Sequence, residues 1–228
     1  MRGTTWERWG AASGLVALAV AGVAVGFERS TPKPNQTPTE VVAFYTDHRS
    51  ALLAQSLLFV LSAGIFLCFL AALRSYLARA EGHTDQLASI TYAAGMAWIV
   101  LNLAVQAPQI ALARAAGRGL RPEVAVVVND IGLALATITD IPVAVLVLTI
   151  AVLSLRANVF PAWVGWLSVL TAAVHLVAWC GILADAGPFA PGGWLTFLAY
   201  PVFVLWLLAI ITTMITSTRP STIDDARA

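Results

Sequence analysis

The sequence contains few charged residues for its length. Of its 228 residues, 11% are charged and 59% are hydrophobic, whereas a soluble domain carries about 25% charged residues. A globule of this size cannot cover its surface with so little charge. The composition therefore indicates a polytopic membrane protein whose main partner is the lipid bilayer.

Several functional signatures are also missing. A net charge of +1 provides no basic surface for nucleic acid. Cys68 and Cys180 lie in separate apolar segments and form neither a C-x-x-C motif nor a metal-ligand spacing, so we expect structural thiols and no metal site. Lys33 is the only lysine and His175 the only histidine inside an apolar segment, which excludes a retinal Schiff base and a bis-histidine haem. We therefore expect no cofactor.

Six apolar segments are each long enough to cross a bilayer, at about 20 residues a span. They cover approximately residues 10–27, 51–73, 87–111, 126–155, 162–184 and 194–216. The sequence thus predicts an all-α fold over residues 1–228, a single bundle of six transmembrane helices. The first segment is long for the apolar part of a signal peptide, so we expect it to be retained.

The longest polar connection, residues 28–50, carries the signal of a short helix. Thr37, Pro38, Thr39 and Glu40 have the pattern of a capping box with proline at the first helical position. We expect an interfacial helix that leads into the second span. Basic residues divide almost equally between the two faces, but the connection 185–193 has none while both chain ends do, which favours N-in/C-in topology.

Asp140 is the one acidic residue deep inside an apolar segment. A charged group there costs about 2.5–3.5 kcal/mol on insertion scales, so it needs a partner or a water-filled cavity. Counting the helical rise of about 1.5 Å per residue from the segment ends places His175 and Asn102 near the same depth. If the fourth and fifth spans face each other, as their short connection indicates, Asp140 and His175 meet.

Polar and aromatic residues of neighbouring spans fall in this same layer, to which Gln55 of the second span also contributes. Three prolines accompany it, Pro108, Pro142 and Pro201, and each can free the carbonyl four residues earlier, at Ala104, Ile138 and Phe197. Kinks at similar depth can widen a bundle into a pocket. The predicted ligand pocket consists of Asn102, Gln106, Thr137, Asp140, His175, Trp179 and Tyr200.

Each of these residues also has a purely structural interpretation. Asparagine and glutamine in spans often join helices, at about 0.6 kcal/mol per hydrogen bond. Aromatic residues such as Trp98 and Trp206 often fill a core, and Asp140 can be a protonated structural acid. We expect Asn102, Asp140 and His175 to face the interior of the bundle.

Three stretches carry a resemblance to a known family. They are residues 39–49 (TEVVAFYTDHR), 69–74 (FLAALR) and 160–167 (FPAWVGWL). The last looks like the Pro-x-Trp-x-Gly-Trp start of a late helix in a bacterial family of uncharacterised six-span membrane proteins, a domain of unknown function, which the chain resembles. The resemblance implies six spans in a bacterial inner membrane, and it implies no catalytic residues.

Three functional hypotheses follow from the polar layer. The first, which we favour, is a pocket that binds a small or lipid-like ligand, or a membrane protein partner, without chemistry. The second is an enzyme in which Asp140, with His175, acts as general acid on an isoprenoid or lipid substrate. The third is a proton-coupled transporter with Asp140 as relay, which the lack of an internal repeat disfavours.

Overall fold

The computed structural model describes residues 5–27, 32–34, 36–82, 85–184 and 186–216, with side chains from Trp9 onward. Parts of the predicted connection 28–50, namely residues 28–31 and 35, lie outside the described residues, as do both chain ends. Every regular element in the described part of the chain is a helix. The predicted all-α class is therefore confirmed.

The helices follow one another with short connections. They are α1 (Thr5–Val25), α2 (Pro38–Asp47), α3 (Arg49–Glu81), α4 (Gln86–Ala116), α5 (Pro122–Ile138), α6 (Asp140–Ala157), α7 (Ala162–Trp179), the 3₁₀ helix η1 (Cys180–Leu183), α8 (Trp194–Phe197) and α9 (Ala199–Thr216). Five units are long and apolar enough to cross a membrane: α3, α4, α5 with α6, α7 with η1, and α8 with α9. The apolar part of α1 is shorter, Trp9–Val25. The chain is thus built as a multi-pass membrane protein.

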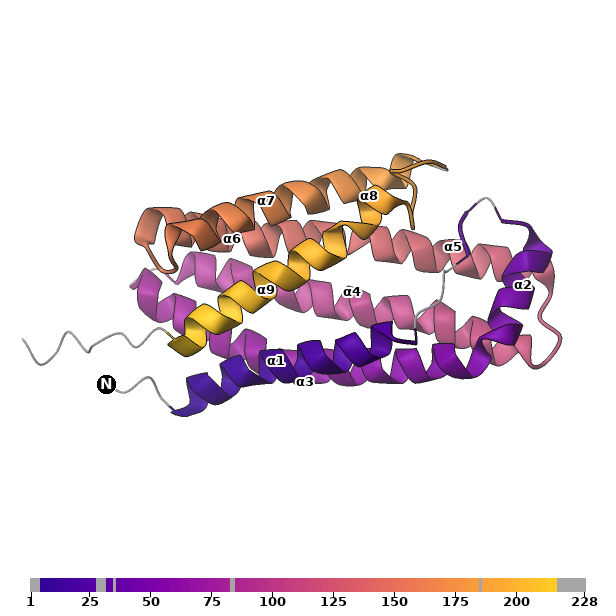
Figure 1. Cartoon of the computed structure of the whole chain (residues 1–228), viewed down its shortest axis with the longest axis horizontal. Coiled ribbons are helices and arrows are strands. Elements are labelled where there is room, and N and C mark those ends of the chain that lie inside the picture. Colours follow the sequence, from indigo (N-terminus) through magenta and orange to yellow (C-terminus); the bar gives the residue numbers. More distant parts are fainter. Residues whose placement is uncertain (1–4, 28–31, 35, 83–84, 185, 217–228) are drawn as a thin grey trace, which may run out of the picture.

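The long helices form a closed ring. Going round it, α1 packs on α3, α3 on α4, α4 on α6, α6 on α7, α7 on α9, and α9 returns to α1. Helix α1 begins and α9 ends at the same end of the bundle, on the left of Figure 1. Helix α2 lies across the opposite end, called here the α2 end.

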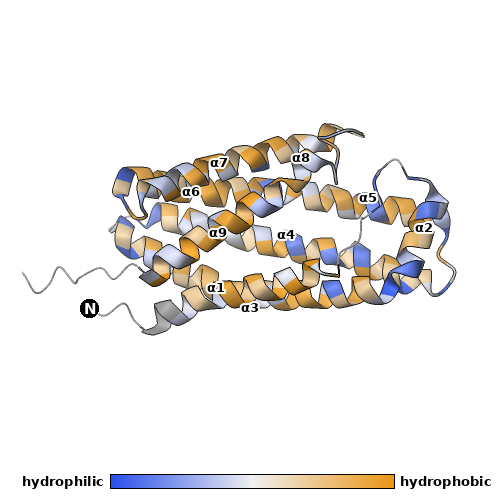
Figure 2. Cartoon of the chain, in the orientation of Figure 1, coloured by the Kyte–Doolittle hydropathy of each residue, from blue (hydrophilic) through white to orange (hydrophobic). Residues whose placement is uncertain are grey.

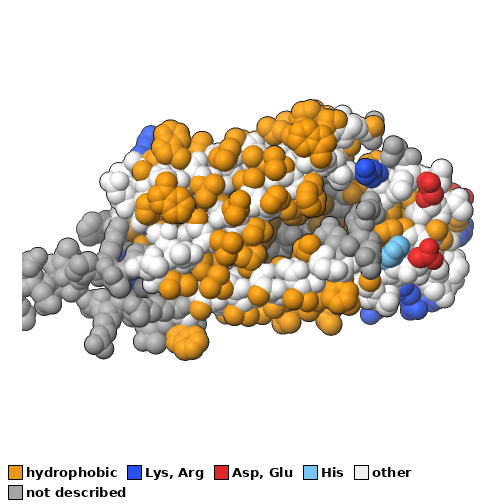
Figure 3. Space-filling view, in the orientation of Figure 1, with side chains coloured by type: hydrophobic (Ala, Val, Ile, Leu, Met, Phe, Trp, Pro, Cys, Tyr) orange, Lys and Arg blue, Asp and Glu red, His pale blue; other side chains and the backbone are white. Residues whose placement is uncertain are grey.

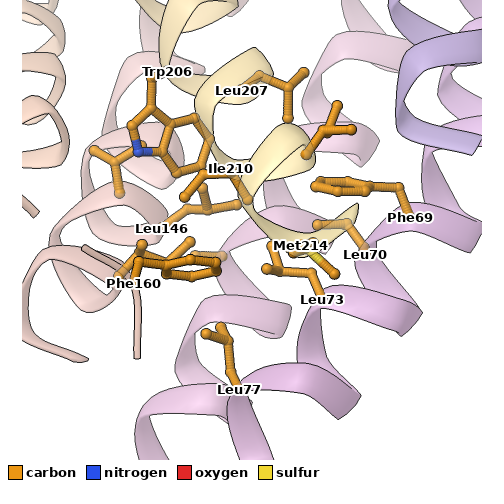
Figure 4. Close-up of a cluster of buried hydrophobic side chains, with 14 of the residues drawn as sticks. Phe69, Leu70, Leu73, Leu77, Leu146, Phe160, Trp206, Leu207, Ile210 and Met214 are labelled. Atoms are coloured by element: carbon orange, nitrogen blue, oxygen red, sulfur yellow. The ribbon is translucent and has the colours of Figure 1, made fainter. Parts of the chain in front are cut away.

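Apolar side chains fill the ring. Those of α9 point toward α3 and α6 in Figure 4, where Trp206 and Ile210 lie beside Leu146, and Met214 lies beside Leu73. Trp206 is 1% exposed, and its Nε1 donates to Oγ of Ser168 at 2.8 Å. Because lipid is as apolar as these side chains, close packing rather than water exclusion holds such a bundle together.

Helix α1 contacts the ring through small residues. A Cβ added at Gly10 would overlap Cβ of Ala72 on α3, and one added at Gly14 would lie 2.8 Å from Phe69. Ser62 Oγ of α3 donates to the carbonyl of Ala17 at 2.8 Å, deep between the two helices. The pair Gly10 and Gly14 has the G-x-x-x-G spacing that allows backbones to approach.

The α2 end has an apolar cluster of its own. The predicted capping box is present: Glu40 accepts a hydrogen bond from the Thr37 backbone N–H at 2.8 Å, which lowers the Glu40 pKa together with a second bond from the Thr37 hydroxyl. Tyr45 donates to Oδ1 of Asn129 on α5 at 3.1 Å, and Asn129 donates to the Pro32 carbonyl at 3.3 Å. The cluster comprises Val41, Tyr45, Leu52, Leu112, Ala113 and Ala125.

The outer surface matches a bilayer environment. Hydrophobic residues continue along the helices in Figure 2, and hydrophilic ones gather at the α2 end and in the connections at the opposite end. The face in Figure 3 is largely apolar between these ends. Exposed tryptophans occur near both ends, with Trp163 and Trp166 at the start of α7 and Trp194 at the start of α8. This distribution is typical of an aromatic belt.

Candidate functional site

The apolar unit formed by α5 and α6 is interrupted beside Asp140. Helix α5 ends at Ile138 and α6 begins at Asp140. Pro142 has no N–H, so the Ile138 carbonyl loses its normal helical partner, as the sequence predicted. Asp140 thus directly follows this interruption, and Thr139 between the two helices keeps a helical backbone conformation.

Asp140 and His175 are in direct contact, as predicted for the case in which the fourth and fifth spans face each other. Oδ1 of Asp140 lies 2.7 Å from Nδ1 of His175, a length typical of a charge-assisted hydrogen bond. The side chains are 15% and 7% exposed, respectively. Packing of α6 against α7 brings them together. With the carboxylate ionised, Nδ1–H donates to it and the imidazole ring is fixed in orientation.

The other ring nitrogen of His175 has no such contact. Nε2 is buried and has no hydrogen-bond partner among the described residues. Oε1 of Gln106 is likewise buried without a hydrogen-bond partner there. A buried polar atom left unpaired costs about 1–3 kcal/mol. Such atoms are rare in native structures, and each requires a physical reason. Nε2 can accept a hydrogen bond when the ring is neutral, or donate one when it is charged.

Aromatic rings border the histidine. Phe203 of α9 meets the His175 ring edge to face, with centroids 5.8 Å apart. Phe203 in turn lies 5.2 Å from Trp98 and 5.4 Å from Trp206, and Trp98 lies 5.2 Å from Phe66. The series joins α3, α4, α7 and α9 at one level of the bundle. The sequence predicted that Trp98 and Trp206 pack in the core. No residue spacing in the sequence indicates that these aromatic rings lie near His175.

Two other predicted pocket residues are satisfied within their own helices. Asn102 is half-buried on α4 and donates to the Trp98 carbonyl at 2.9 Å. Thr137 is 7% exposed and donates to the Leu133 carbonyl at 3.0 Å. Gln106 is half-buried on α4. These residues lie in the bundle, but the structure records no hydrogen bond from them to Asp140 or His175.

Trp179 and Tyr200 are not brought into this group. Trp179 is 39% exposed and Tyr200 is 65% exposed, so both occupy the outer surface of the bundle. Trp179 follows His175 by four residues and Tyr200 follows Thr196 by four, so helical spacing places each pair near one helix face. The exposure of Trp179 and Tyr200 shows that this spacing does not select inward-facing residues alone.

The predicted polar layer also separates into two groups. Nε2 of Gln109 donates to Oε1 of Gln55, to Oγ of Ser56 and to the Leu52 carbonyl, at 3.0, 2.9 and 3.3 Å. This second group joins α3 to α4 nearer the α2 end. Gln55 therefore takes part in hydrogen bonds that join α3 to α4, and the structure records no hydrogen bond between it and Asp140.

Two hollows on the surface are lined by residues other than Asp140 and His175. The larger, about 590 Å³, lies against α8 and is bordered by Lys33 and Trp194. The smaller, about 390 Å³, lies at the end of α4. The described residues bring no third histidine, cysteine, aspartate or glutamate to the Asp140–His175 pair.

No family model, curated protein or solved structure matches the chain.

Proposed function

We propose that this chain is a six-span protein of a bacterial inner membrane with both ends in the cytoplasm. Close packing of α1 at Gly10 and Gly14 supports its assignment as the sixth span. The start of α1 and the end of α9 share one end of the bundle, as an even number of spans requires. The resemblance of residues 39–49, 69–74 and 160–167 to a bacterial six-span family supports the location.

Cysteine accessibility tests this topology. Cys68 and Cys180 are first replaced by alanine, and Thr46→Cys or Thr216→Cys is then introduced. A membrane-impermeant maleimide is expected to label the first position in intact spheroplasts and the second only after lysis. The opposite pattern would reverse the orientation, and labelling of both in spheroplasts would exclude five crossings between the two positions.

We propose that the bundle binds a small or lipid-like ligand through Nε2 of His175. The observation that carries this proposal is the buried nitrogen without a partner, held in place by the 2.7 Å contact of the other ring nitrogen with Asp140. A ligand with a hydroxyl or amide N–H recovers the missing hydrogen bond. Phe203, Trp98 and Phe66 supply an apolar border for the rest of it.

Each side chain has a separate task in this arrangement. Asp140 orients the imidazole and fixes which nitrogen faces the ligand. His175 makes the polar contact, because the Asp140 oxygen that faces it is already engaged. The aromatic rings favour an apolar body over a highly charged one. The expected ligand class is thus an amphiphile or small lipid with one hydrogen-bonding head.

Mass spectrometry of molecules that remain bound through purification in mild detergent tests the proposal. The wild type is expected to retain a small molecule that Asp140→Asn and His175→Gln both lose. Thr149→Val is the matched control, since Thr149 is another buried polar residue of α6 that bonds Thr91 and not the pair. Retention of the same molecule by His175→Leu with unchanged or raised thermal stability would refute the role of Nε2.

Proton-coupled transport is a second candidate, and one observation favours it. Two helices are interrupted near the pair, α5/α6 at Thr139 and α8/α9 at Leu198. Discontinuous helices are typical of transporter binding sites. Reconstituted vesicles with an internal pH dye test it: an acidification that depends on added substrate should occur with the wild type and fail with Asp140→Asn. Equal acidification by both proteins would exclude a relay through Asp140.

A further inference from the structure

The outward face of α4 ends in two arginines. Val100, Leu103, Ala107 and Ala111 follow one another at intervals of three or four residues and are all exposed, so they form one apolar stripe. Arg114 and Arg118 continue the same spacing toward the α2 end and are also exposed. The exposure of these residues shows that the other described helices leave this stripe of α4 uncovered.

A hollow lies where the stripe meets the arginines. Its volume is about 390 Å³, and it is lined by Ala111, Arg114, Ala115, Arg118, Gly119 and Leu120. Two guanidinium groups therefore border it with no acidic side chain in the lining. Ala111 belongs both to the lining and to the stripe, so the hollow adjoins the apolar stripe of α4.

The guanidinium groups are available to a ligand. Arg118 Nε donates to the Arg114 carbonyl at 3.4 Å, which leaves the terminal nitrogens of Arg118 outside that bond. Within the described part of the chain, neither arginine forms an ion pair with an acidic residue. A third guanidinium, of Arg49, lies against Gly117, where an added Cβ would be 3.2 Å from its Nη1. Three positive groups thus surround the carboxyl end of α4.

We propose that this hollow binds the phosphate of an anionic phospholipid, with an acyl chain along the α4 stripe. Arginine forks match phosphate oxygens in two-point hydrogen bonds, which are stronger than neutral ones. The apolar stripe distinguishes a lipid from a soluble phosphate, because a soluble anion gains nothing from Val100 to Ala111. This site is separate from the Asp140–His175 pair, and it stands whether or not that pair binds a ligand.

Thermal unfolding in neutral detergent tests the site with lipids of matched chains. Phosphatidylglycerol is expected to raise the melting temperature of the full-length protein, while phosphatidylcholine and soluble glycerol phosphate leave it nearly unchanged. The double variant Arg114→Gln/Arg118→Gln should weaken the apparent lipid affinity at least about tenfold, as expected for the loss of charge-assisted hydrogen bonds. Arg156→Gln is the control, since Arg156 is an exposed arginine in the last turn of α6 at the opposite end.

A second variant keeps the test informative if the double variant fails to fold. Ala111→Phe fills the hollow from an exposed position without changing charge, and it should reduce phosphatidylglycerol binding measured by native mass spectrometry. Three outcomes would overturn the proposal: equal stabilisation by phosphatidylcholine, equal stabilisation by glycerol phosphate, or equal loss of binding in Arg156→Gln. Lipid binding unchanged by both Ala111→Phe and the arginine variants would do the same.

Discussion

Replacement of Gly10 by alanine should weaken the packing of α1 against α3. The new methyl group would overlap Cβ of Ala72, and neither atom belongs to a side chain that can rotate away. The two helices must therefore move apart at this level. Such a shift also strains the hydrogen bond from Ser62 to the Ala17 carbonyl, two turns further along α1.

The expected magnitude follows from a matched substitution in the same helix. A Cβ at Gly22 has nothing within 4 Å, so Gly22→Ala changes helix propensity and no packing. Inserting one methyl group into a closely packed contact costs about 1–3 kcal/mol. Because the gain in helix propensity is common to both variants, it cancels in their difference. Gly10→Ala should thus be about 1–3 kcal/mol less stable than Gly22→Ala.

Reversible unfolding in dodecyl sulfate, followed by far-ultraviolet circular dichroism, measures this difference. Equal unfolding midpoints for the two variants would refute the close α1–α3 contact. That result would also remove the main support for α1 as a sixth span.

Two further predictions concern contacts near the ends of the bundle. Burial raises the pKa of Tyr45 to about 12 from 10.0, so the stability it contributes is complete below pH 10 and is lost as pH rises from 10 toward 12. Absorbance at 295 nm should show a late-titrating phenol that is missing in Tyr45→Phe, and an ordinary tyrosine titration for Tyr45 would contradict its burial. Glu81 accepts hydrogen bonds from the N–H groups of Leu87 and Ala88 at the start of α4, so Glu81→Ala should cost about 0.5–2 kcal/mol by chemical unfolding. Arg74→Gln, which breaks an exposed ion pair with Asp85, should cost less than about 1 kcal/mol, and a reversed order would contradict the capping role.

The three prolines predicted to free a carbonyl differ in their effect on the helix. Helix α5 ends at Ile138 and α8 ends at Phe197, each four residues before a proline, as the missing N–H dictates. Helix α4 continues through Pro108, whose ring packs against Gly132 of α5. The local sequence determines which carbonyl is freed. Packing against a neighbouring helix determines whether the helix then stops.

Depth along a helix was easier to predict from the sequence than the helix face that points inward. Counting residues placed Asp140 and His175 at similar depth, and the short connection between their spans indicated that they meet. The 2.7 Å contact confirms that pairing. Helical spacing selected Trp179 and depth selected Tyr200, and both are exposed. In a soluble protein an apolar stripe reveals the inward face, but lipid makes the outward face equally apolar. The inward face then depends on contacts among helices that are distant in sequence.

The glycines of α1 also show that the sequence alone does not reveal which residues contact another helix. The pair Gly22 and Gly26 has the same G-x-x-x-G spacing as Gly10 and Gly14. An added Cβ at Gly10 or Gly14 would meet another helix, whereas one at Gly22 has nothing within 4 Å. The unpaired Nε2 of His175 could not have been predicted either. Its burial depends on Phe203 of α9, a residue whose position relative to α7 is set by the whole ring.

The unequal lengths of the helices concern their polar ends rather than their apolar parts. Helix α3 has 33 residues and α7 with η1 has 22, which correspond to about 50 and 33 Å at 1.5 Å per residue. The apolar stretches within them, residues 51–73 and 162–184, are equally long, and each matches a bilayer core about 30 Å thick. The last turns of α3, from Arg74 to Glu81, therefore extend beyond the core. In a membrane, α3 reaches farther into the water than α7 does.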